Sequence, residues 1–345
     1  MENISITSPS QVNENSAVTA SQDMFAYDGD TGKIYQIWIV NLGLKIITLF
    51  IYNSWAKTRM RRYVYSRFSL KGEAFHYSGT GGEIFKGSMK VFGLLFGFFL
   101  LVGVFEAVGT GMASGMPSAE LIYTGLALFT TLLTYIAIFF LMPFGEYSGK
   151  RYRLARTKWR GIRGALTGSA SSYARTSMKY MLINIFTLFL KKPKYDTLLR
   201  KKLVGDLQFG QQKCEFNEDA ASLYRIHYIT LALFIPTLGI SRLWYRAELK
   251  NLYLNHMRAG AVGFKGTQTG GALFRLVFGN ILLAITMIGA PYALQRYVRY
   301  FAKHTHVMGD IESLDLKQAA DRATATGDVL GEEYDVGVEF DMGLI

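Results

Sequence analysis

Runs of apolar residues alternate with short basic stretches along most of the chain. Two runs, 91–108 and 121–141, are almost uncharged, and each is long enough to cross the ~30 Å hydrocarbon core of a bilayer as a helix. Four other runs are shorter or are interrupted by polar residues. The pattern predicts an all-α polytopic membrane protein with six apolar helices. Their approximate ranges are 33–54, 88–110, 119–143, 176–190, 222–243 and 270–293.

Basic stretches follow five of the six segments, and their positions conflict with a simple topology. If every segment spans, successive loops lie on opposite sides of the membrane. Some basic stretches then fall outside, against the positive-inside bias. Either that bias is broken, or some weaker segments are re-entrant and return to the side from which they came. We prefer six spanning segments, and the re-entrant alternative stays open.

The chain also repeats itself. A tract that ends in Trp, at 48–55, recurs at 237–244, and a Thr-Gly-Gly follows each copy at the same distance. Weaker matches, of 67–90 with 156–179 and of 143–157 with 291–305, show that a smaller unit is reused. Each unit combines a membrane segment, a basic interfacial helix, a short polar turn and another segment. We therefore expect an N-terminal disordered tail, two membrane repeat regions and an acidic disordered C-terminal tail. Their ranges are 1–24, 25–190, 191–307 and 308–345.

Short β-strands are expected between the helices. The residues at 68–77 alternate in polarity around Lys71-Gly72, which is typical of a small β-hairpin at the membrane surface. Similar short tracts occur at 25–27 and 264–266. We expect these strands to pair within or between repeats.

Charge is distributed unevenly along the chain. The whole chain has a formal charge of +12, but residues 25–307 hold 36 basic and 13 acidic residues, a net charge of +23, because both tails are acidic. In a chain with such long apolar runs, this charge favours an anionic phospholipid surface as partner and argues against nucleic acid. The single cysteine, Cys214, excludes an intramolecular disulfide. The polar residues 1–24 do not resemble a cleaved signal peptide.

The basic residues and the glycines at helix starts supply the candidate sites. Arginines that alternate with aromatic residues can bind lipid headgroups from interfacial helices, or can simply orient the protein as loop charges. The Thr-Gly-Gly tracts fit ordinary helix N-caps or anion sites, and the N-cap interpretation is preferred. Trp55 and Trp244 are expected to anchor segment ends at the membrane interface. The candidate lipid or anion contacts are Arg59, Arg62, Thr80, Gly81, Gly82, Arg151, Thr269, Gly270, Gly271 and Arg299.

Four polar residues fall within the apolar segments. Lys45 lies near the middle of the first segment and Glu106 near the end of the second, so they are candidates for a functional pair. Asn184 and Asn280 are expected to form hydrogen bonds between helices. No arrangement typical of a catalytic centre, a cofactor site or a metal site is found in the sequence.

Three tracts together resemble the YjgN-like family. They are the repeated tract at 48–55, the Arg-Arg-Tyr at 61–63, and the stretch at 75–82. The resemblance covers about residues 25–307 and implies a bacterial multi-pass inner-membrane protein of unknown function. Near 191–215 the chain departs from the family pattern, which indicates a degenerate third unit.

The sequence thus favours a non-enzymatic integral protein of the bacterial inner membrane that binds lipid or an envelope protein partner. The alternative is a small-solute transporter or channel built on the internal repeats. The oligomeric state, and which weak segments truly span, stay open at this point.

Overall fold

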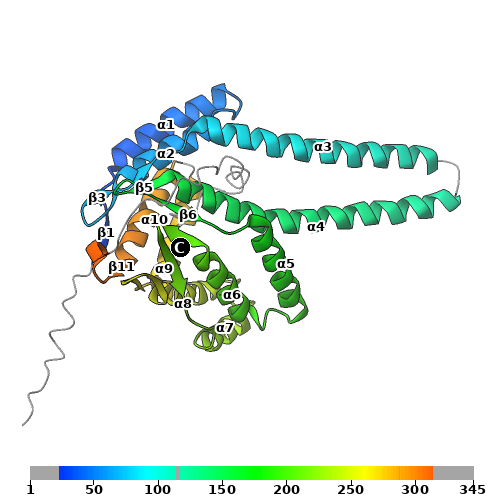
Figure 1. Ribbon diagram of the computed structural model, residues 1–345. Helices are drawn as coiled ribbons and strands as arrows, with labels where there is room; N and C mark the ends of the chain where they lie inside the picture. The colour runs from blue at the N-terminus through cyan, green and yellow to red at the C-terminus, as the bar shows by residue number, and fades with distance from the viewer. Residues whose placement is uncertain (1–22, 114–116, 287, 314–345) are drawn as a thin grey trace, which may run out of the picture.

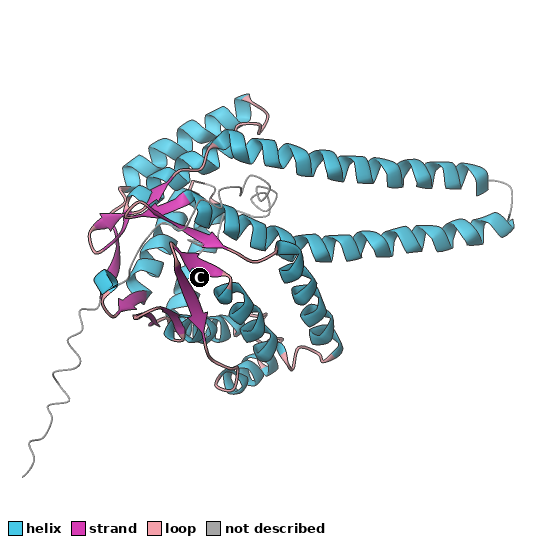
Figure 2. Cartoon of the chain, viewed as in Figure 1, coloured by secondary structure: helices cyan, strands magenta, loops and turns pink. Residues whose placement is uncertain are grey.

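The computed structural model describes residues 23–113, 117–286 and 288–313, in which helices and short strands alternate (Figures 1 and 2). In the described residues the helices come in five consecutive pairs, with no strand between the two helices of a pair. The pairs are α1 (Thr31–Ile47) and α2 (Asn53–Ser66), α3 (Gly81–Ala113) and α4 (Pro117–Arg156), α5 (Ala170–Phe186) and α6 (Lys192–Gly205), α7 (Leu223–Ala232) and α8 (Arg242–Asn255), and α9 (Gly270–Ile285) and α10 (Ala290–His304).

The strands lie between these helical hairpins and all belong to one antiparallel sheet. They are β1 (Asp23–Tyr27), β2 (Phe68–Leu70), β3 (Glu73–Ala74), β4 (His76–Tyr77), β5 (Thr157–Trp159), β6 (Ile162–Leu166), β7 (Leu207–Phe209), β8 (Gln212–Phe216), β9 (Met257–Ala259), β10 (Val262–Gly266) and β11 (Thr305–Met308). A 3-10 turn, Ile311–Ser313, follows the last strand.

The sheet closes on itself. Its strand order is β3-β2-β1-β11-β10-β9-β8-β7-β6-β5-β4, so the two edge strands are β3 and β4. One residue, Phe75, separates these two strands in the chain, and the two edges therefore meet there. Two strands from β3 in this order, β1 pairs with β11, which joins the two ends of the described chain. Closure leaves the sheet without a long exposed edge on which another chain could add a strand.

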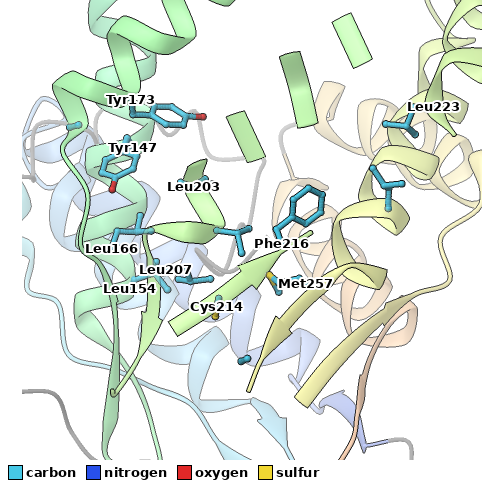
Figure 3. Packing of buried hydrophobic residues seen from close by; sticks show 14 of the residues in the cluster. Tyr147, Leu154, Leu166, Tyr173, Leu203, Leu207, Cys214, Phe216, Leu223 and Met257 are labelled. Carbon is cyan, nitrogen blue, oxygen red and sulfur yellow. The ribbon is translucent and has the colours of Figure 1, made fainter. Parts of the chain in front are cut away.

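The two faces of the sheet differ in chemistry, because side chains alternate along each strand. One face packs residues of β1, β2, β4, β5, β10 and β11 into one core, in which Phe25, Phe75 and Trp159 meet with Val64 of α2 and Phe301 of α10. A second core fills the space under α4, α5, α6 and α8 and includes the residues labelled in Figure 3. The helices thus cover the apolar face, and the other face carries polar and basic side chains.

The repeating unit consists of one helical hairpin and the pair of strands that follows it. Strands β5, β7 and β9 begin at Thr157, Leu207 and Met257, a regular spacing of ~50 residues. β2 begins at Phe68, much farther ahead of β5, because the α3–α4 hairpin between them is much longer than the other hairpins. The unequal spacing of the repeats in the sequence therefore arises from one unit in which a single helical hairpin has been extended.

Glycine fixes the turns between paired strands. Lys71-Gly72 and Arg160-Gly161 have positive φ at both positions, as a type I′ hairpin turn requires. Gly210 and Gly260 open the next two turns, also with positive φ. This confirms the turn expected at Lys71-Gly72.

Two expectations about the fold class are corrected. The chain is mostly helical, but it is not all-α, since the expected small hairpins join into one eleven-stranded sheet. Six apolar helices are not confirmed: in the described residues only two helices, within α3 and α4, are long and apolar enough to cross a membrane. The other apolar segments form helices of 10 to 17 residues that end in tight turns.

The two predicted repeat regions, 25–190 and 191–307, share this sheet, because β6 pairs with β7 and β1 with β11. Of the predicted tails, residues 23–24 belong to β1, and 308–313 include the end of β11 and the 3-10 turn. Residues 1–22 and 314–345 lie outside the described part of the chain.

The turn glycines give a direct test of the ring. We expect Gly161→Ala to lower the free energy of unfolding by about 1–2 kcal/mol, because an L-residue is strained in the left-handed region. A Cβ at Gly161 meets no atom within 4 Å, so the effect is one of backbone conformation alone. Gly263→Ala in β10 is the matched control, since its Cβ also meets nothing and its φ is not positive. Equal thermal unfolding midpoints for the two variants in detergent would contradict the assignment.

Candidate membrane-inserting surface

The α3–α4 hairpin projects away from the rest of the molecule (Figure 1). The most apolar 18 residues of the α3 span, Gly81–Gly109, have a mean hydropathy of 2.4, and those of the α4 span, Leu121–Arg156, have one of 2.1. At 1.5 Å per residue, the 29 residues of the first span reach about 43 Å, more than the ~30 Å hydrocarbon core. The most apolar part of each helix is not buried against the protein.

The four shorter hairpins end in apolar residues that point away from the protein. The turn between α1 and α2 presents Leu49, which is 84% exposed, and the turn between α7 and α8 presents Leu238, which is 92% exposed. Phe186 beside the α5–α6 turn and Ile285 beside the α9–α10 turn are similarly exposed. A cluster of large, exposed apolar side chains marks a site for a protein or lipid partner.

Three of these turns are closed by a backbone hydrogen bond. The amide N–H groups of Phe50, Phe189 and Gly239 each donate to the carbonyl five residues earlier, at 2.7–2.8 Å. These residues and the leucines before them have positive φ, which lets each helix end in a closed turn. In hydrocarbon, every unpaired backbone group costs several kcal/mol, so a closed turn is what an inserted tip needs.

A threonine hydroxyl completes three of the turns. Thr48 Oγ1 donates to the Leu44 carbonyl at 2.7 Å and accepts from the Tyr52 amide at 3.0 Å. Thr237 and Thr286 each make a corresponding pair of backbone hydrogen bonds in the α7–α8 and α9–α10 turns. The repeated Thr-Leu tract of the sequence is therefore the tip of a helical hairpin.

Asparagines connect the two helices of a hairpin. Asn41 Nδ2 donates to the Ala56 carbonyl at 3.3 Å, and Asn280 Nδ2 donates to the Ala293 carbonyl at 3.1 Å. Asn280 was expected to bond between helices and does so, whereas this role of Asn41 was not expected. Asn184 is buried near the end of α5, where its Oδ1 has no hydrogen-bond partner among the described residues, so its expected bond between helices is not confirmed.

The candidate pair of Lys45 and Glu106 is not brought together. Lys45 lies in the last turn of α1, close to the hairpin tip. Trp55, just after the same tip, packs at the start of α3 against Gly81. Glu106 lies much farther along α3, about 37 Å from Gly81 at a rise of ~1.5 Å per residue, so the two charges lie at different depths.

The two tryptophans, Trp55 and Trp244, pack against the first glycines of the Thr-Gly-Gly tracts. Thr269 Oγ1 accepts from the Ala272 amide at 3.3 Å, the bond of a helix N-cap. A Cβ at Gly81 would lie 2.5 Å from the Trp55 indole, and one at Gly270 would lie 2.4 Å from the Trp244 indole. The first glycine of each tract thus allows close packing between neighbouring hairpins. Thr80 Oγ1 accepts from the Glu83 amide, and Gly82 and Gly271 follow within the first helical turns.

Three of the four candidate arginines bind the protein backbone. Arg62 donates to the Gly79 carbonyl at 2.9 Å, Arg151 to the Gly168 carbonyl at 3.1 Å, and Arg299 to the Gly29 carbonyl at 3.3 Å. Each carbonyl belongs to the strand-to-helix connection of an adjacent unit, so these arginines connect neighbouring units. Asn251 takes the same role toward Gln268 in another unit. Arg59 is exposed and stays the best lipid candidate of the four.

A polar cluster between α6, α7 and α8 was not identified from the sequence. Asp196 accepts hydrogen bonds from Tyr245 Oη at 2.9 Å and from Lys192 Nζ at 2.8 Å. His227, which is fully buried, lies with Nε2 2.9 Å from the Phe189 carbonyl and Nδ1 3.2 Å from Arg242 Nη1. The carbonyl and the guanidinium together require a neutral imidazole with its proton on Nε2. The cluster connects two hairpins and holds the α5–α6 tip in place.

The sequence contained only one indication of this polar cluster. His227 interrupts an apolar run, which marks it as a polar residue with a special environment. Its partners, Arg242 and the Phe189 carbonyl, lie on another helix and in another turn, so spacing in the sequence could not identify them.

Comparison with known proteins places the chain among bacterial membrane proteins. The model of a family described as "Bacterial protein of unknown function (DUF898)" matches residues 22–241 and 226–335. A protein named inner membrane protein YjgN from Salmonella typhimurium (strain LT2) is 23% identical over 364 residues, which cover 84% of this chain and 89% of that protein.

Shorter matches carry the same name. Inner membrane protein YjgN of Escherichia coli O157:H7 is 32% identical over 139 residues, covering 40% of this chain and 30% of that protein. The protein of that name from Escherichia coli (strain K12) is 29% identical over 149 residues, covering 43% of this chain and 32% of that protein. No solved structure matches the chain.

The resemblance to the YjgN-like family is confirmed, and with it the location in the inner membrane, to which the exposed apolar helices are suited. The family match extends over almost the whole described chain. The protein is therefore a member of the DUF898 family of bacterial proteins of unknown function.

Proposed function

We propose that this protein is a non-enzymatic membrane protein that binds anionic phospholipid of one leaflet through its re-entrant hairpins. In this proposal α3 and α4 cross the bilayer, and the tips of the shorter hairpins enter the near leaflet beside them. The observation that carries the proposal is the repeated tip, with exposed leucines at Leu49 and Leu238 on a backbone closed by its own hydrogen bonds. Such a tip can leave water without leaving polar groups unpaired.

The positions of the basic side chains fit hairpin tips that reach the centre of the bilayer. Arg59 lies ten residues from Leu49, Arg246 eight residues from Leu238, and Arg275 ten residues from Ile285. At 1.5 Å per residue these separations are about 12–15 Å, close to the ~15 Å thickness of one hydrocarbon leaflet. All three arginines are exposed. When the tips reach the bilayer centre, the arginines lie at the level of the lipid phosphates.

The α5–α6 hairpin inserts less deeply in this arrangement. Lys191 is exposed and directly follows the apolar turn, and Lys194 is exposed one helical turn later. Ammonium groups so close to the tip are costly in hydrocarbon, so this hairpin stays at the headgroup level, where its lysines add to the basic surface.

Re-entrant hairpins also remove the conflict in the charge pattern. A hairpin that turns back within the leaflet returns its second, basic helix to the side of the sheet. Basic stretches in α2, α6, α8 and α10, and the one at the end of α4, then lie on a single side. By the positive-inside bias that side is the cytoplasm.

The transporter or channel alternative gains no support from the structure. It depended on Lys45 and Glu106 as a pair at a common depth, and they lie at different depths. The repeat that suggested it is a surface hairpin unit in four of its five copies.

Topology distinguishes two spans from six. With two spans and four re-entrant hairpins, a reporter fused after residue 113 lies on the opposite side of the membrane from reporters fused after 205 and 307. With six spans, all three positions lie on one side. We expect a reporter active only outside the cytoplasm to be active after 113 and inactive after 205 and 307. Equal activity at the three positions would rule out re-entrant hairpins.

Insertion of the tips can be measured with spin labels. The native Cys214 is buried, and burial raises the pKa of its thiol to about 11, so it does not compete for a thiol reagent at neutral pH. We expect a label at Leu238→Cys, in protein reconstituted into bilayers, to show high accessibility to oxygen and low accessibility to a water-soluble nickel complex. A label at Glu215→Cys, exposed on the sheet, is the aqueous control. Water-like accessibility at both positions would exclude insertion.

Lipid binding is tested by charge reversal at the predicted phosphate level. A triple variant with Arg59→Glu, Arg246→Glu and Arg275→Glu should retain several-fold less anionic phospholipid after purification, as measured by lipid analysis. The control reverses three exposed charges on strands β8, β9 and β10, at Lys213, Arg258 and Lys265. Because both variants change the net charge equally, equal lipid retention would contradict the proposal.

A further inference from the structure

The outer face of the closed sheet is a basic surface. We call the solvent-facing side of the sheet, opposite the apolar cores, its outer face. Cross-strand partners project to the same side of a sheet, so the register assigns Lys158 with Arg163, Gln208 with Lys213, and Glu215 with Arg258 to this face. Lys265 and His306 also pair and belong to it. The basic residues of the outer face are Lys158, Arg163, Lys213, Arg258 and Lys265.

This positive charge is poorly compensated by the described part of the chain. Glu215 is the one acidic residue among the cross-strand partners just named. Lys158, Lys213, Arg258 and Lys265 form no ion pair with any residue in 23–113, 117–286 or 288–313. Lys213, Arg258 and Lys265 are exposed. A surface of this kind attracts an anionic partner.

The end of the described chain is held at the turn between β5 and β6, two residues after Lys158 of the outer face. Glu312 binds Arg160 through two hydrogen bonds, of 2.8 and 3.0 Å, and Arg160 also binds Glu73 at 3.0 Å. Arg160 lies in the turn between β5 and β6, close to Lys158 in the chain. The hydrogen bonds from Arg160 hold the pKa of the Glu312 carboxyl below its usual value, with Lys71 adding to the effect. A bidentate arginine–carboxylate contact fixes direction as well as position.

The residues that follow are acidic. The segment 314–345 contains eight acidic residues and only Lys317 and Arg322 as basic ones. Its 32 residues can reach about 100 Å when extended, more than enough to follow several strands spaced ~4.8 Å apart. The acidic residues are Asp315, Asp321, Asp328, Glu332, Glu333, Asp335, Glu339 and Asp341.

We propose that the acidic segment 314–345 binds the basic outer face of the sheet of its own chain. The contact begins at the Arg160–Glu312 pair and continues through carboxylates over Lys158, Lys213, Arg258 and Lys265. The segment neutralises the surface that lies away from the hairpin tips, so that other polyanions must displace it before they bind there. Because the segment is tethered, its effective concentration at the surface is high even though each exposed ion pair is weak.

This inference does not depend on lipid binding by the hairpins. It rests on the sheet register and on the Glu312 contact, and it holds whichever way the hairpins meet the bilayer. Its failure would leave the membrane proposal intact, and the reverse is also true.

A zero-length carbodiimide crosslinker tests the contact, since it joins only carboxylates and amines that touch. We expect the full-length protein in detergent at low salt to give crosslinks from Glu332, Glu333 or Asp335 to Lys158, Lys213 or Lys265. Their yield should fall several-fold at about 1 M salt, where the Debye length is only about 3 Å. The exposed hairpin lysines Lys86, Lys179 and Lys194 serve as internal controls.

Two variants keep the test decisive. Changing Glu332, Glu333 and Asp335 to amides should abolish their crosslinks without affecting folding, because none lies in the described fold. Lys213→Glu with Lys265→Glu should reduce crosslinking at the remaining Lys158. Crosslinks spread equally over outer-face and hairpin lysines would overturn the proposal. So would crosslinks that form only between isotope-labelled and unlabelled copies, which would place the segment on a second molecule.

Discussion

The need to pair every backbone polar group within the protein governs this structure. At the hairpin tips, the amides of Phe50, Phe189 and Gly239 reach back five residues, and threonine hydroxyls bridge further backbone groups. Around the ring, β1 pairs with β11, and the two edges meet at Phe75, so no long edge is left open. The same requirement is met in two ways. In the proposed arrangement the tips lie in hydrocarbon, where no water can pair with their backbone, and an open sheet edge would recruit other chains.

One repeating unit produces two kinds of helical hairpin. In four copies the helical hairpin is short and ends in a closed apolar turn, whereas in the second copy α3 and α4 extend far enough to cross a bilayer. The unit retains its contacts at the base in both cases, since Arg62 and Arg151 bind the carbonyls 17 residues ahead in the same manner. The helical hairpin can therefore be longer or shorter without changing these contacts or the closed sheet.

The basic residues of the chain divide into three sets with different roles. Arg62, Arg151 and Arg299 donate to backbone carbonyls and hold adjacent units together. Exposed arginines on the hairpins, such as Arg59 and Arg246, lie where the proposal places lipid phosphates. A third set lies on the outer face of the sheet. A net charge summed over the whole chain hides this division, because the acidic residues of 314–345 offset much of the basic charge.

Local signals in the sequence were enough to establish a repetitive membrane protein with small β-hairpins, because apolar run length, the Thr-Leu tract and Lys71-Gly72 are each read within one short segment. They also singled out Arg62, Arg151 and Arg299, but as lipid or anion contacts and not as donors to backbone carbonyls. Only the folded chain reveals that four apolar segments turn back, that the hairpins close into one sheet, and that Trp55 packs on Gly81. Each of these depends on contacts between residues far apart in the chain, or on a few backbone angles at a tip. Hydropathy along a segment shows how apolar the segment is. It does not show whether the turn that follows reverses the direction of the chain.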